Sequence, residues 1–479
     1  MSVLQKLMKP SSALSVARRY TSNSGKYEGL SYDRIRKIRA DKLHPSVSLA
    51  TYYKRPLLIT RGHMQYVWDV EGRKYLDLFA GIVTISVGHC HPKVNEAAKK
   101  QIDTLWHTTC IYMTSPVHEY AEKLTAKLPG NLKVCYFVNS GSEANDLALM
   151  LARLYTGNYD IVSLRNAYHG MTSSVMGITN LSTWKQPSPT SFGIHRSINP
   201  DPYRGPWGGA RCRDSPVQTD RHCDCVAGQC KASDQYVDQV EDLLNYGVPK
   251  KGVAGIILES IQGVGGTVQY PKGFVKRAFD LIRSRGGICI SDEVQTGFGR
   301  TGDYWGFEGH DVVPDMVVMA KGIGNGFPMG ALVMTPEIAK SLTQAAHFNT
   351  FGGNPIAGVV GSAVLDVIDE EKLQQNSLEV GTYFLQRLAE LKKDVKEIGD
   401  VRGKGLMIGI EMVEDRQTKK PLGSEKMLAA FEKMKDYGVL VGMGGLHRNS
   451  FRIKPPMCIT KADVDTAIDA MKRAFKETL

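Results

Sequence analysis

The stretch Ser291-Asp292-Glu293-Val294-Gln295-Thr296-Gly297-Phe298-Gly299-Arg300-Thr301-Gly302 (residues 291–302) decides the fold, together with Pro314-Asp315-Met316-Val317-Val318-Met319-Ala320-Lys321-Gly322 (residues 314–322). Apolar runs deliver Asp292 and Lys321, so both are expected at the tips of neighbouring buried strands. A lysine amine can form a Schiff base there, and a nearby carboxylate can keep a ring nitrogen protonated. Alone, Asp292 would more often cap a helix and Lys321 would be a solvated charge. Their joint placement indicates a cofactor site.

Short apolar runs alternate with helical patterns between Tyr120 and about Leu365. This alternation predicts an α/β fold with a mostly parallel sheet wrapped by helices. The expected strands are residues 133–138, 161–164, 253–258, 287–290 and 315–319. Ligands of such sheets bind beyond the carboxyl ends of the strands, so the polar residues that follow these runs should converge on one crevice.

Two more strand ends offer what a flat, phosphorylated cofactor needs. Residues 139–145 (Asn-Ser-Gly-Ser-Glu-Ala-Asn) open a helix, where Gly141 allows close backbone approach and free amides can hold a phosphate. An ordinary capped helix start would look similar. Tyr168 follows the next strand and can stack on a ring, although a buried packing aromatic is the commoner role of such a residue. With Asp292 and Lys321, these positions indicate pyridoxal phosphate chemistry.

The chain is long enough for at least two lobes, because 479 residues exceed the size at which one core stops growing. We predict a large cofactor-binding domain over residues 86–370, with an insertion at about 202–235. A smaller domain is expected from residues 371–479, packed with an N-terminal segment of residues 28–85. Its last helix should begin at a capping box formed by Thr460 and Asp463.

Residues 1–27 carry five basic side chains, no acidic one and several serines, which is typical of a mitochondrial transit peptide. The alternative is a merely frayed basic terminus. The formal net charge is +11, yet no dense Lys/Arg cluster indicates nucleic-acid binding. No apolar run approaches the length of a membrane span. We therefore expect a mitochondrial matrix protein that binds neither nucleic acid nor membrane.

Four of the nine cysteines gather in the insertion, at Cys212, Cys223, Cys225 and Cys230. Thiolates in this number can close a tetrahedral zinc shell. The spacing is not that of a usual paired zinc knuckle, so reduced surface thiols are the favoured interpretation and no metal is predicted.

The quoted motifs resemble those of the class III aminotransferases of fold type I, with coverage from about Ala40 to the C-terminus. Within that family, residues 81–92 and the insertion residues 205–217 resemble the alanine–glyoxylate subgroup. The resemblance implies a large domain with a mostly parallel seven-stranded sheet, a smaller α+β domain from the two chain ends, and pyridoxal 5'-phosphate as cofactor.

The resemblance also implies a role for each matching residue. Lys321 would form the Schiff base, and Asp292 would pair with the ring nitrogen. Tyr168 and Val294 would sandwich the ring, while Gln295 would face its hydroxyl. The remaining matches are Gly141 and Ser142 for the phosphate, Thr350 reaching the phosphate from a second subunit, and Arg452 gripping the substrate carboxylate. A site completed by a second subunit implies a homodimer or a higher homo-oligomer.

The family's ornithine and γ-aminobutyrate aminotransferases place a glutamate where this chain has Val264, and that glutamate can neutralise the substrate-binding arginine. Its replacement leaves Arg452 available in both half reactions. We therefore expect amino transfer from L-alanine, or from short β-amino acids such as 3-aminoisobutyrate, to glyoxylate or pyruvate. The alternatives are an ω-amino acid aminotransferase, a pyridoxal-phosphate-dependent phospho-lyase, and a non-catalytic metal-binding or interaction protein.

Overall fold

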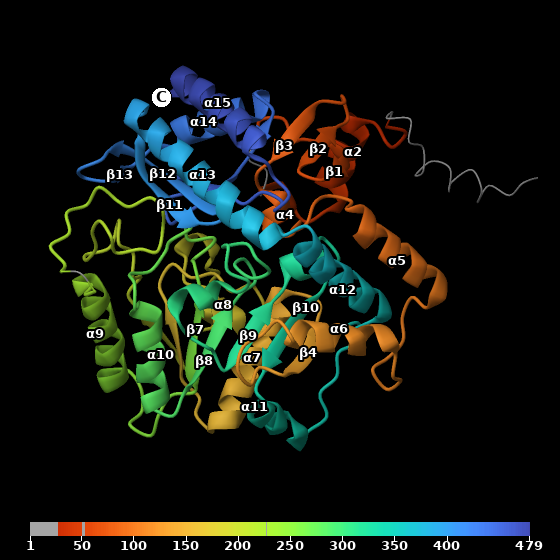
Figure 1. The fold of residues 1–479 in the computed structure, drawn as a ribbon, viewed down its shortest axis with the longest axis vertical. Coiled ribbons are helices and arrows are strands. Elements are labelled where there is room, and N and C mark those ends of the chain that lie inside the picture. Colours follow the sequence, from red (N-terminus) through yellow and green to blue (C-terminus); the bar gives the residue numbers. More distant parts are fainter. Residues whose placement is uncertain (1–26, 50–52, 227) are drawn as a thin grey trace, which may run out of the picture.

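The computed structural model describes residues 27–49, 53–226 and 228–479 (Figure 1). The predicted transit peptide lies outside these residues except for Tyr27. The largest sheet has seven strands, which are, in spatial order, β4 (Val134–Val138), β10 (Gly330–Met334), β9 (Met316–Met319), β8 (Ile288–Asp292), β7 (Gly255–Glu259), β5 (Ile161–Leu164) and β6 (Ile194–Ser197). Only β10 runs antiparallel to its neighbours. The predicted α/β class, with its mostly parallel sheet, is confirmed.

Helices cover both faces of this sheet, and the side chains of β9 accordingly alternate between two apolar clusters. Val318 belongs to the apolar cluster that includes helix α7 (Gly141–Thr156). Val317 and Met319 belong to the cluster that includes α12 (Pro355–Glu370). Every residue of β7 to β10 is buried, as expected for strands covered on both sides.

Two further helices, α9 (Lys231–Tyr246) and α10 (Phe274–Ser284), pack against each other and share an apolar cluster with residues of β5, β7 and β8. The shorter or more peripheral helices are α2 (Tyr32–Lys42), α3 (Pro45–Leu49), α4 (Ala80–Val83), α5 (Pro92–Thr104), α6 (Ser115–Thr125), α8 (Val175–Ile178) and α11 (Pro336–Lys340). Short 3₁₀ turns span Ser182–Trp184, Gly306–His310, Lys321–Gly324 and Ser341–Gln344. None of the described helices combines the length and the apolar character that a membrane span requires.

The C-terminal part of the chain forms a second sheet, seen in blue in Figure 1. Its strands are β11 (Ile398–Lys404), β12 (Met407–Asp415), β16 (Ser450–Ile453), β15 (Gly442–Gly444) and β13 (Lys420–Pro421). Its helices are α13 (Leu373–Asp394), α14 (Ser424–Asp436) and α15 (Lys461–Thr478). Helix α15 begins at the expected capping box, in which Thr460 and Asp463 bond each other's backbone amides.

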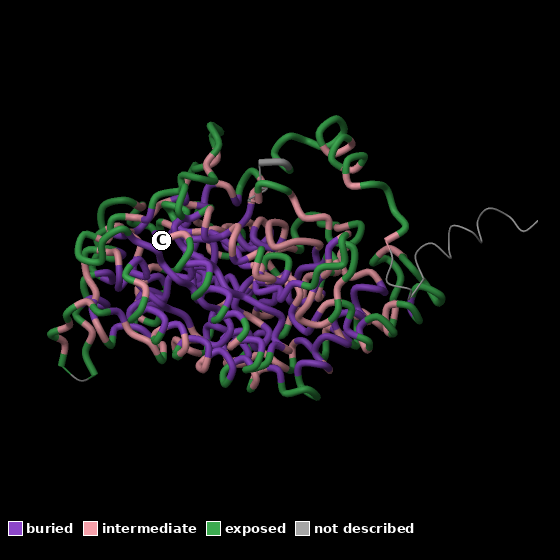
Figure 2. Tube along the Cα trace, turned by 90° about the horizontal axis from the view of Figure 1, so that it is seen from above, coloured by how far each residue is buried: buried purple, intermediate pink, exposed green. Residues whose placement is uncertain are grey.

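The N-terminal segment is joined to this C-terminal part through a third sheet. It contains β1 (Ile59–His63), β2 (Tyr66–Asp69), β3 (Lys74–Asp77) and the C-terminal strand β14 (Val439–Leu440). Strands β3 and β14 pair in parallel, with Leu76 opposite Val439. Burial is continuous through the middle of the molecule, as Figure 2 shows.

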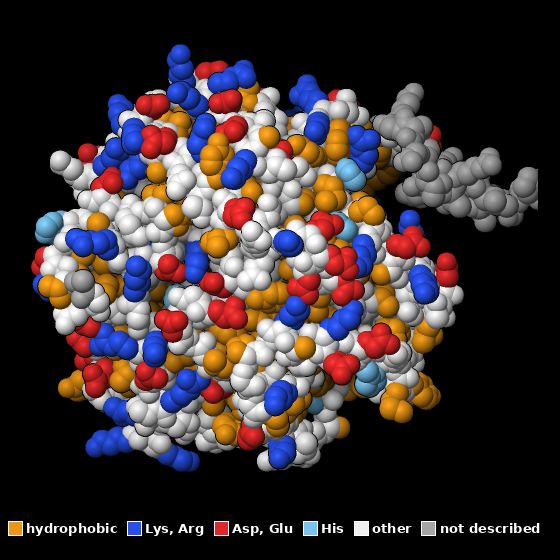
Figure 3. All heavy atoms as spheres, in the orientation of Figure 1, with side chains coloured by type: hydrophobic (Ala, Val, Ile, Leu, Met, Phe, Trp, Pro, Cys, Tyr) orange, Lys and Arg blue, Asp and Glu red, His pale blue; other side chains and the backbone are white. Residues whose placement is uncertain are grey.

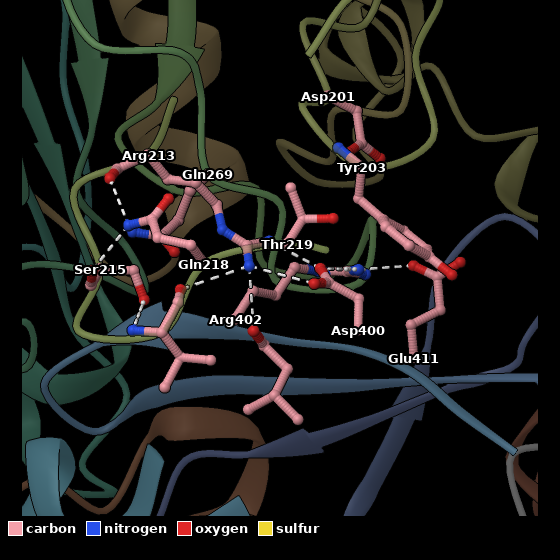
Figure 4. A network of polar contacts seen from close by, with 12 residues as sticks. Asp201, Tyr203, Arg213, Ser215, Gln218, Thr219, Gln269, Asp400, Arg402 and Glu411 are labelled. Atoms are coloured by element: carbon pink, nitrogen blue, oxygen red, sulfur yellow. Dashed lines mark hydrogen bonds and ion pairs between the residues drawn. The ribbon is translucent and has the colours of Figure 1, made fainter. Parts of the chain in front are cut away.

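Buried charges attach the insertion to the C-terminal sheet (Figure 4). The guanidinium of Arg213 donates to both oxygens of Asp400, at 2.6 and 3.0 Å, and each side chain is 1% exposed. Arg402 pairs with Asp400 at 3.2 Å and with Glu411 at 2.6 Å. Moving the insertion away from β11 and β12 would leave these buried charges without partners, which is energetically costly. These contacts therefore hold the insertion against the two strands.

Candidate active site

A cavity of about 300 Å³ opens where the carboxyl ends of the parallel strands meet the start of α7. Strand register aligns these ends, since Asp292 on β8 lies opposite Glu259 on β7 and Val318 on β9. Seven of the nine predicted site residues line the cavity: Gly141, Ser142, Tyr168, Asp292, Val294, Gln295 and Lys321. Thr350 and Arg452 are not in its wall.

Asp292 is held rigidly by three donors. Its Oδ2 accepts hydrogen bonds from His169 Nδ1 at 2.7 Å and from Asn145 Nδ2 at 3.0 Å. Its Oδ1 accepts from the backbone amide of Val294 at 3.0 Å. The carboxylate is 4% exposed, so it acts in a poorly hydrated environment. Because these donors already fix the carboxylate, it does not have to reorient before it interacts with a ligand in the cavity.

Lys321 follows β9 and has a backbone φ of 51°, a region that a non-glycine residue seldom adopts. Burial lowers the pKa of its amine to about 8, and the neighbouring Asp292 opposes part of that shift. A lysine with this pKa has far more neutral amine at pH 7 than an exposed lysine. The side chain is therefore suited to attack a carbonyl.

The start of α7 provides a cradle for an anion. Ser140 caps the helix through a bond from the amide of Glu143, while no hydrogen bond to a described residue engages the amides of Gly141 and Ser142. A Cβ at Gly141 would come within 3.1 Å of Val294. A Cβ at Gly170 would lie 2.2 Å from the hydroxyl of Ser142, so only glycine leaves that hydroxyl in place. Free amides at a helix N-terminus bind phosphate well.

Tyr168 is placed by Glu259, whose carboxylate accepts the backbone amide of Tyr168 at 3.0 Å and that of Gly263 at 2.7 Å. Burial raises the pKa of Glu259. The ring of Tyr168 packs edge-on against Trp184, with centroids 5.0 Å apart. This contact orients an aromatic ring in the cavity wall.

Arg452 lies behind the cavity, on β16. Its guanidinium stands 5.6 Å from the ring centre of Phe79, and its Nη2 lies 3.3 Å from Gln295 Oε1. Gly444 accommodates this side chain, since a Cβ there would meet Arg452 Cδ at 2.5 Å and the carbonyl of Val264 at 2.8 Å. Arg452 and the backbone of Val264 thus flank the same glycine.

Thr350 is exposed, in a segment with exposed aromatic side chains. Phe351 is 61% exposed, and its ring contacts His107 from the α5–α6 loop with centroids 5.5 Å apart. That loop also exposes Ile111 and Met113, at 78% and 89%. Together they form an exposed apolar patch of the kind that marks an interface between proteins.

The cysteine segment differs from the surface arrangement that the sequence suggested, because Cys212 is buried. Its sulfur lies 3.6 Å from that of Cys230, and all nine cysteines are free thiols. Cys223 and Cys225 are partly exposed. Over the described ranges, no three Cys, His, Asp or Glu side chains are arranged to hold a metal ion.

Sequence reasoning assigned no role to several residues of the site. Thr84 joins the cavity wall from the N-terminal segment, and His169 and Asn145 hold Asp292. Lys454 is fully buried and donates to Gln295 Oε1 at 3.0 Å. Asn145 and Thr84 lie inside the motifs of residues 139–145 and 81–92, and His169 directly follows Tyr168, but the sequence alone gave no reason to assign a role to any of the three.

The chain belongs to the class III aminotransferases, whose family model matches residues 49–475. It is 55% identical over 454 residues to human alanine–glyoxylate aminotransferase 2, mitochondrial, covering 94% of this chain and 88% of that protein. A phospholyase from Arthrobacter in complex with phosphoethanolamine has a TM-score of 0.82 at 30% identity, covering 93% of this chain and 99% of that one. An amine transaminase from an uncultivated Pseudomonas species, in the pyridoxal-phosphate-bound form, has a TM-score of 0.80 at 29% identity, covering 88% and 95%.

This chain is therefore an aminotransferase, of a family that acts on amino and oxo acids. Membership implies pyridoxal phosphate, and the donor set fits that group. The helix amides suit its phosphate, Asp292 suits a protonated ring nitrogen, and the amine of Lys321 suits its aldehyde.

Proposed function

We propose that this enzyme transfers the amino group of L-alanine, or of short β-amino acids such as 3-aminoisobutyrate, to glyoxylate or pyruvate by a ping-pong mechanism. The observation that carries the proposal is the meeting of Lys321, Asp292 and the α7 amides around one cavity, with Arg452 directly behind it. The human relative's name includes alanine and glyoxylate, two of the proposed substrates.

The cofactor, when bound, supplies an aldehyde that condenses with amines and a ring that accepts electrons. Asp292 would hold the ring nitrogen and favour its protonated form, which strengthens that electron withdrawal. When its amine is not joined to the cofactor, Lys321 would be a free base at the cavity wall, placed to take a proton from the substrate carbon and to return it. Its lowered pKa, about 8, supports this role because a catalytic base works best near the operating pH.

Substrate choice follows from Arg452. A guanidinium can hold a carboxylate through two parallel hydrogen bonds, and burial strengthens each of them. The position of a competing glutamate is taken by the buried side chain of Val264. Arg452 therefore stays available to the carboxylate of alanine in the first half reaction and of glyoxylate in the second.

The direct test mixes the purified, cofactor-loaded enzyme with single amino acids and follows the cofactor's absorbance through the first half reaction. L-Alanine and 3-aminoisobutyrate should convert it faster than γ-aminobutyrate or ornithine. A faster conversion by either of the latter would refute the assignment.

Phosphoethanolamine cleavage is the second candidate, because the Arthrobacter phospholyase covers nearly the whole chain. Oxo-acid dependence separates the two reactions, since a lyase needs no amino acceptor. Release of inorganic phosphate from phosphoethanolamine without added glyoxylate would favour the lyase.

A second copy of the chain would complete the site. The exposed apolar patch of residues 105–113 and 348–351 supports a homodimer or higher homo-oligomer, with Thr350 brought to the partner's phosphate site. Thr350→Ala should weaken cofactor binding without changing the mass measured by light scattering. A monomeric wild-type enzyme with full activity would contradict this arrangement.

The same proposal extends to location and domain division. Relatives named mitochondrial and the basic, acid-free residues 1–27 support import into the matrix. Pairing of β3 with β14 supports a small domain built from residues 28–85 and 371–479, beside a large domain of residues 86–370.

A further inference from the structure

Two basic side chains from one strand end converge on a single amide. Arg452 and Lys454 are two residues apart along β16 and its extension, so both point to the same face. Gln295 Oε1 accepts from Lys454 Nζ at 3.0 Å and from Arg452 Nη2 at 3.3 Å. Lys454 Nζ also lies 3.3 Å from the carbonyl of Gly263. Two separate donors therefore hold the oxygen of one side-chain amide.

These donors determine which way the amide of Gln295 points. A guanidinium has no acceptor, so the end of the amide facing Arg452 has to be the oxygen. The Nε2 group then faces away from both donors. Gln295 lines the cavity, and no described residue accepts a hydrogen bond from its Nε2. That N–H group is left for the ring oxygen of a bound cofactor.

Of the two donors, only Lys454 has no second task in the proposed reaction. A substrate carboxylate draws Arg452 into new hydrogen bonds and weakens its longer contact with Gln295. Lys454 is fully buried behind the amide and makes no ion pair with any described residue. It can hold the oxygen throughout both half reactions.

Burying this lysine is costly, which argues that it has a use. Burial pushes the pKa of Lys454 well below its usual value, and Arg452, Lys321 and Arg300 lower it further, against Glu259. An unbranched apolar side chain of similar length would avoid the desolvation cost. An acidic partner for Lys454 would stand beside Arg452 and compete with the substrate carboxylate. A lysine bonded only to neutral oxygens avoids that competition.

We infer that Lys454 is a positioning residue, which keeps the Gln295 amide turned with Nε2 toward the cofactor's ring oxygen while Arg452 binds the substrate. The inference rests on the proposed function. A hydrogen bond donated to the ring oxygen stabilises its negative charge and so disfavours protonation of the neighbouring nitrogen that joins cofactor and enzyme. The pH midpoint of the bound cofactor's absorbance reports this effect.

The test replaces Lys454 in two backgrounds. Lys454→Met should raise the absorbance midpoint by about 0.5 to 1 pH unit in the wild-type enzyme and by much less in Gln295→Leu, because its effect passes through the amide. Lys454→Gln, which retains an N–H donor, should give a smaller shift than Lys454→Met and serves if the methionine variant fails to load cofactor. Lys392→Met is the matched control, since Lys392 is also largely buried but pairs with Asp220 of the insertion.

Each outcome decides the inference. An equal shift in both backgrounds would mean that the charge of Lys454 acts directly, and an unchanged midpoint would mean that Gln295 needs no support; either overturns the positioning role. A fall in kcat larger than the change in KM for alanine agrees with it. Failure of the wild-type enzyme to react with alanine would instead refute the proposed function, so the two failures are distinguishable.

Discussion

Replacing Asp292 by Asn should leave a folded, cofactor-binding protein that turns over very slowly. The substitution preserves the volume of a side chain that is 4% exposed, and the amide oxygen can still accept from Val294. The negative charge is lost, and with it the preference for a protonated ring nitrogen. A carboxylate at this range is worth about 1 to 3 pKa units, or about 1.4 to 4 kcal/mol. We therefore expect the first half reaction with L-alanine to slow by about 10- to 1000-fold.

Stopped-flow absorbance under single-turnover conditions measures this step without product release. Asp315→Asn is the matched control, because the carboxylate of Asp315 also caps a strand of the same sheet, accepting the amide of Cys289 at 2.7 Å, away from the cavity. If Asp292→Asn reacts within about twofold of the wild-type enzyme, the ring nitrogen does not depend on this carboxylate and the reasoning is wrong.

Three other substitutions test the site. Lys321→Ala should bind the cofactor through the helix amides but not covalently, so borohydride treatment should leave no label on the peptide. For the wild-type apoenzyme, the rate of covalent cofactor loading should rise with pH and reach half its maximum near pH 8, because the neutral amine is the reactive form. A rate that does not change with pH would contradict the lowered pKa of Lys321. Arg452→Gln should reduce kcat/KM for alanine by about 10- to 150-fold, because charge-assisted hydrogen bonds to the substrate carboxylate are lost. The effect on amines that lack a carboxylate should be smaller. Equal losses for both kinds of substrate would mean that Arg452 does not bind the carboxylate. Val264→Glu should raise the KM for alanine by bringing a carboxylate near Arg452. An unchanged KM in steady-state kinetics would mean that a carboxylate at position 264 does not interact with Arg452.

The large sheet was open to prediction because its signal is local. Strand β5 was expected at residues 161–164 and occupies Ile161–Leu164. Asp292 and Lys321 were placed correctly at strand ends, since apolar runs and the reactive residues that follow them are adjacent in sequence. Seven predicted residues meet in one cavity because parallel strands deliver their carboxyl ends to one edge.

Features that join distant segments were not predictable in this way. Lys454 and Gln295 are separated by 159 positions, and periodicity says nothing about such a pairing. Cys212 was expected at the surface but is buried in the apolar cluster that includes residues of α9 and α10, and the neighbouring Arg213 pairs with Asp400 of the C-terminal sheet. A single sequence shows the charge of Arg213 but not the partner that neutralises it.

That ion pair has a consequence for synthesis on the ribosome. Arg213 and Asp400 are 187 residues apart in the sequence. At a translation rate of about 5 to 20 residues per second, Asp400 is therefore synthesised roughly 10 to 40 seconds after Arg213. During that interval the insertion lacks the contact that later buries it, even though the strands just before it are already available for pairing. The nascent chain therefore finishes this region last, and the moment of completion is set by translation of the C-terminal sheet.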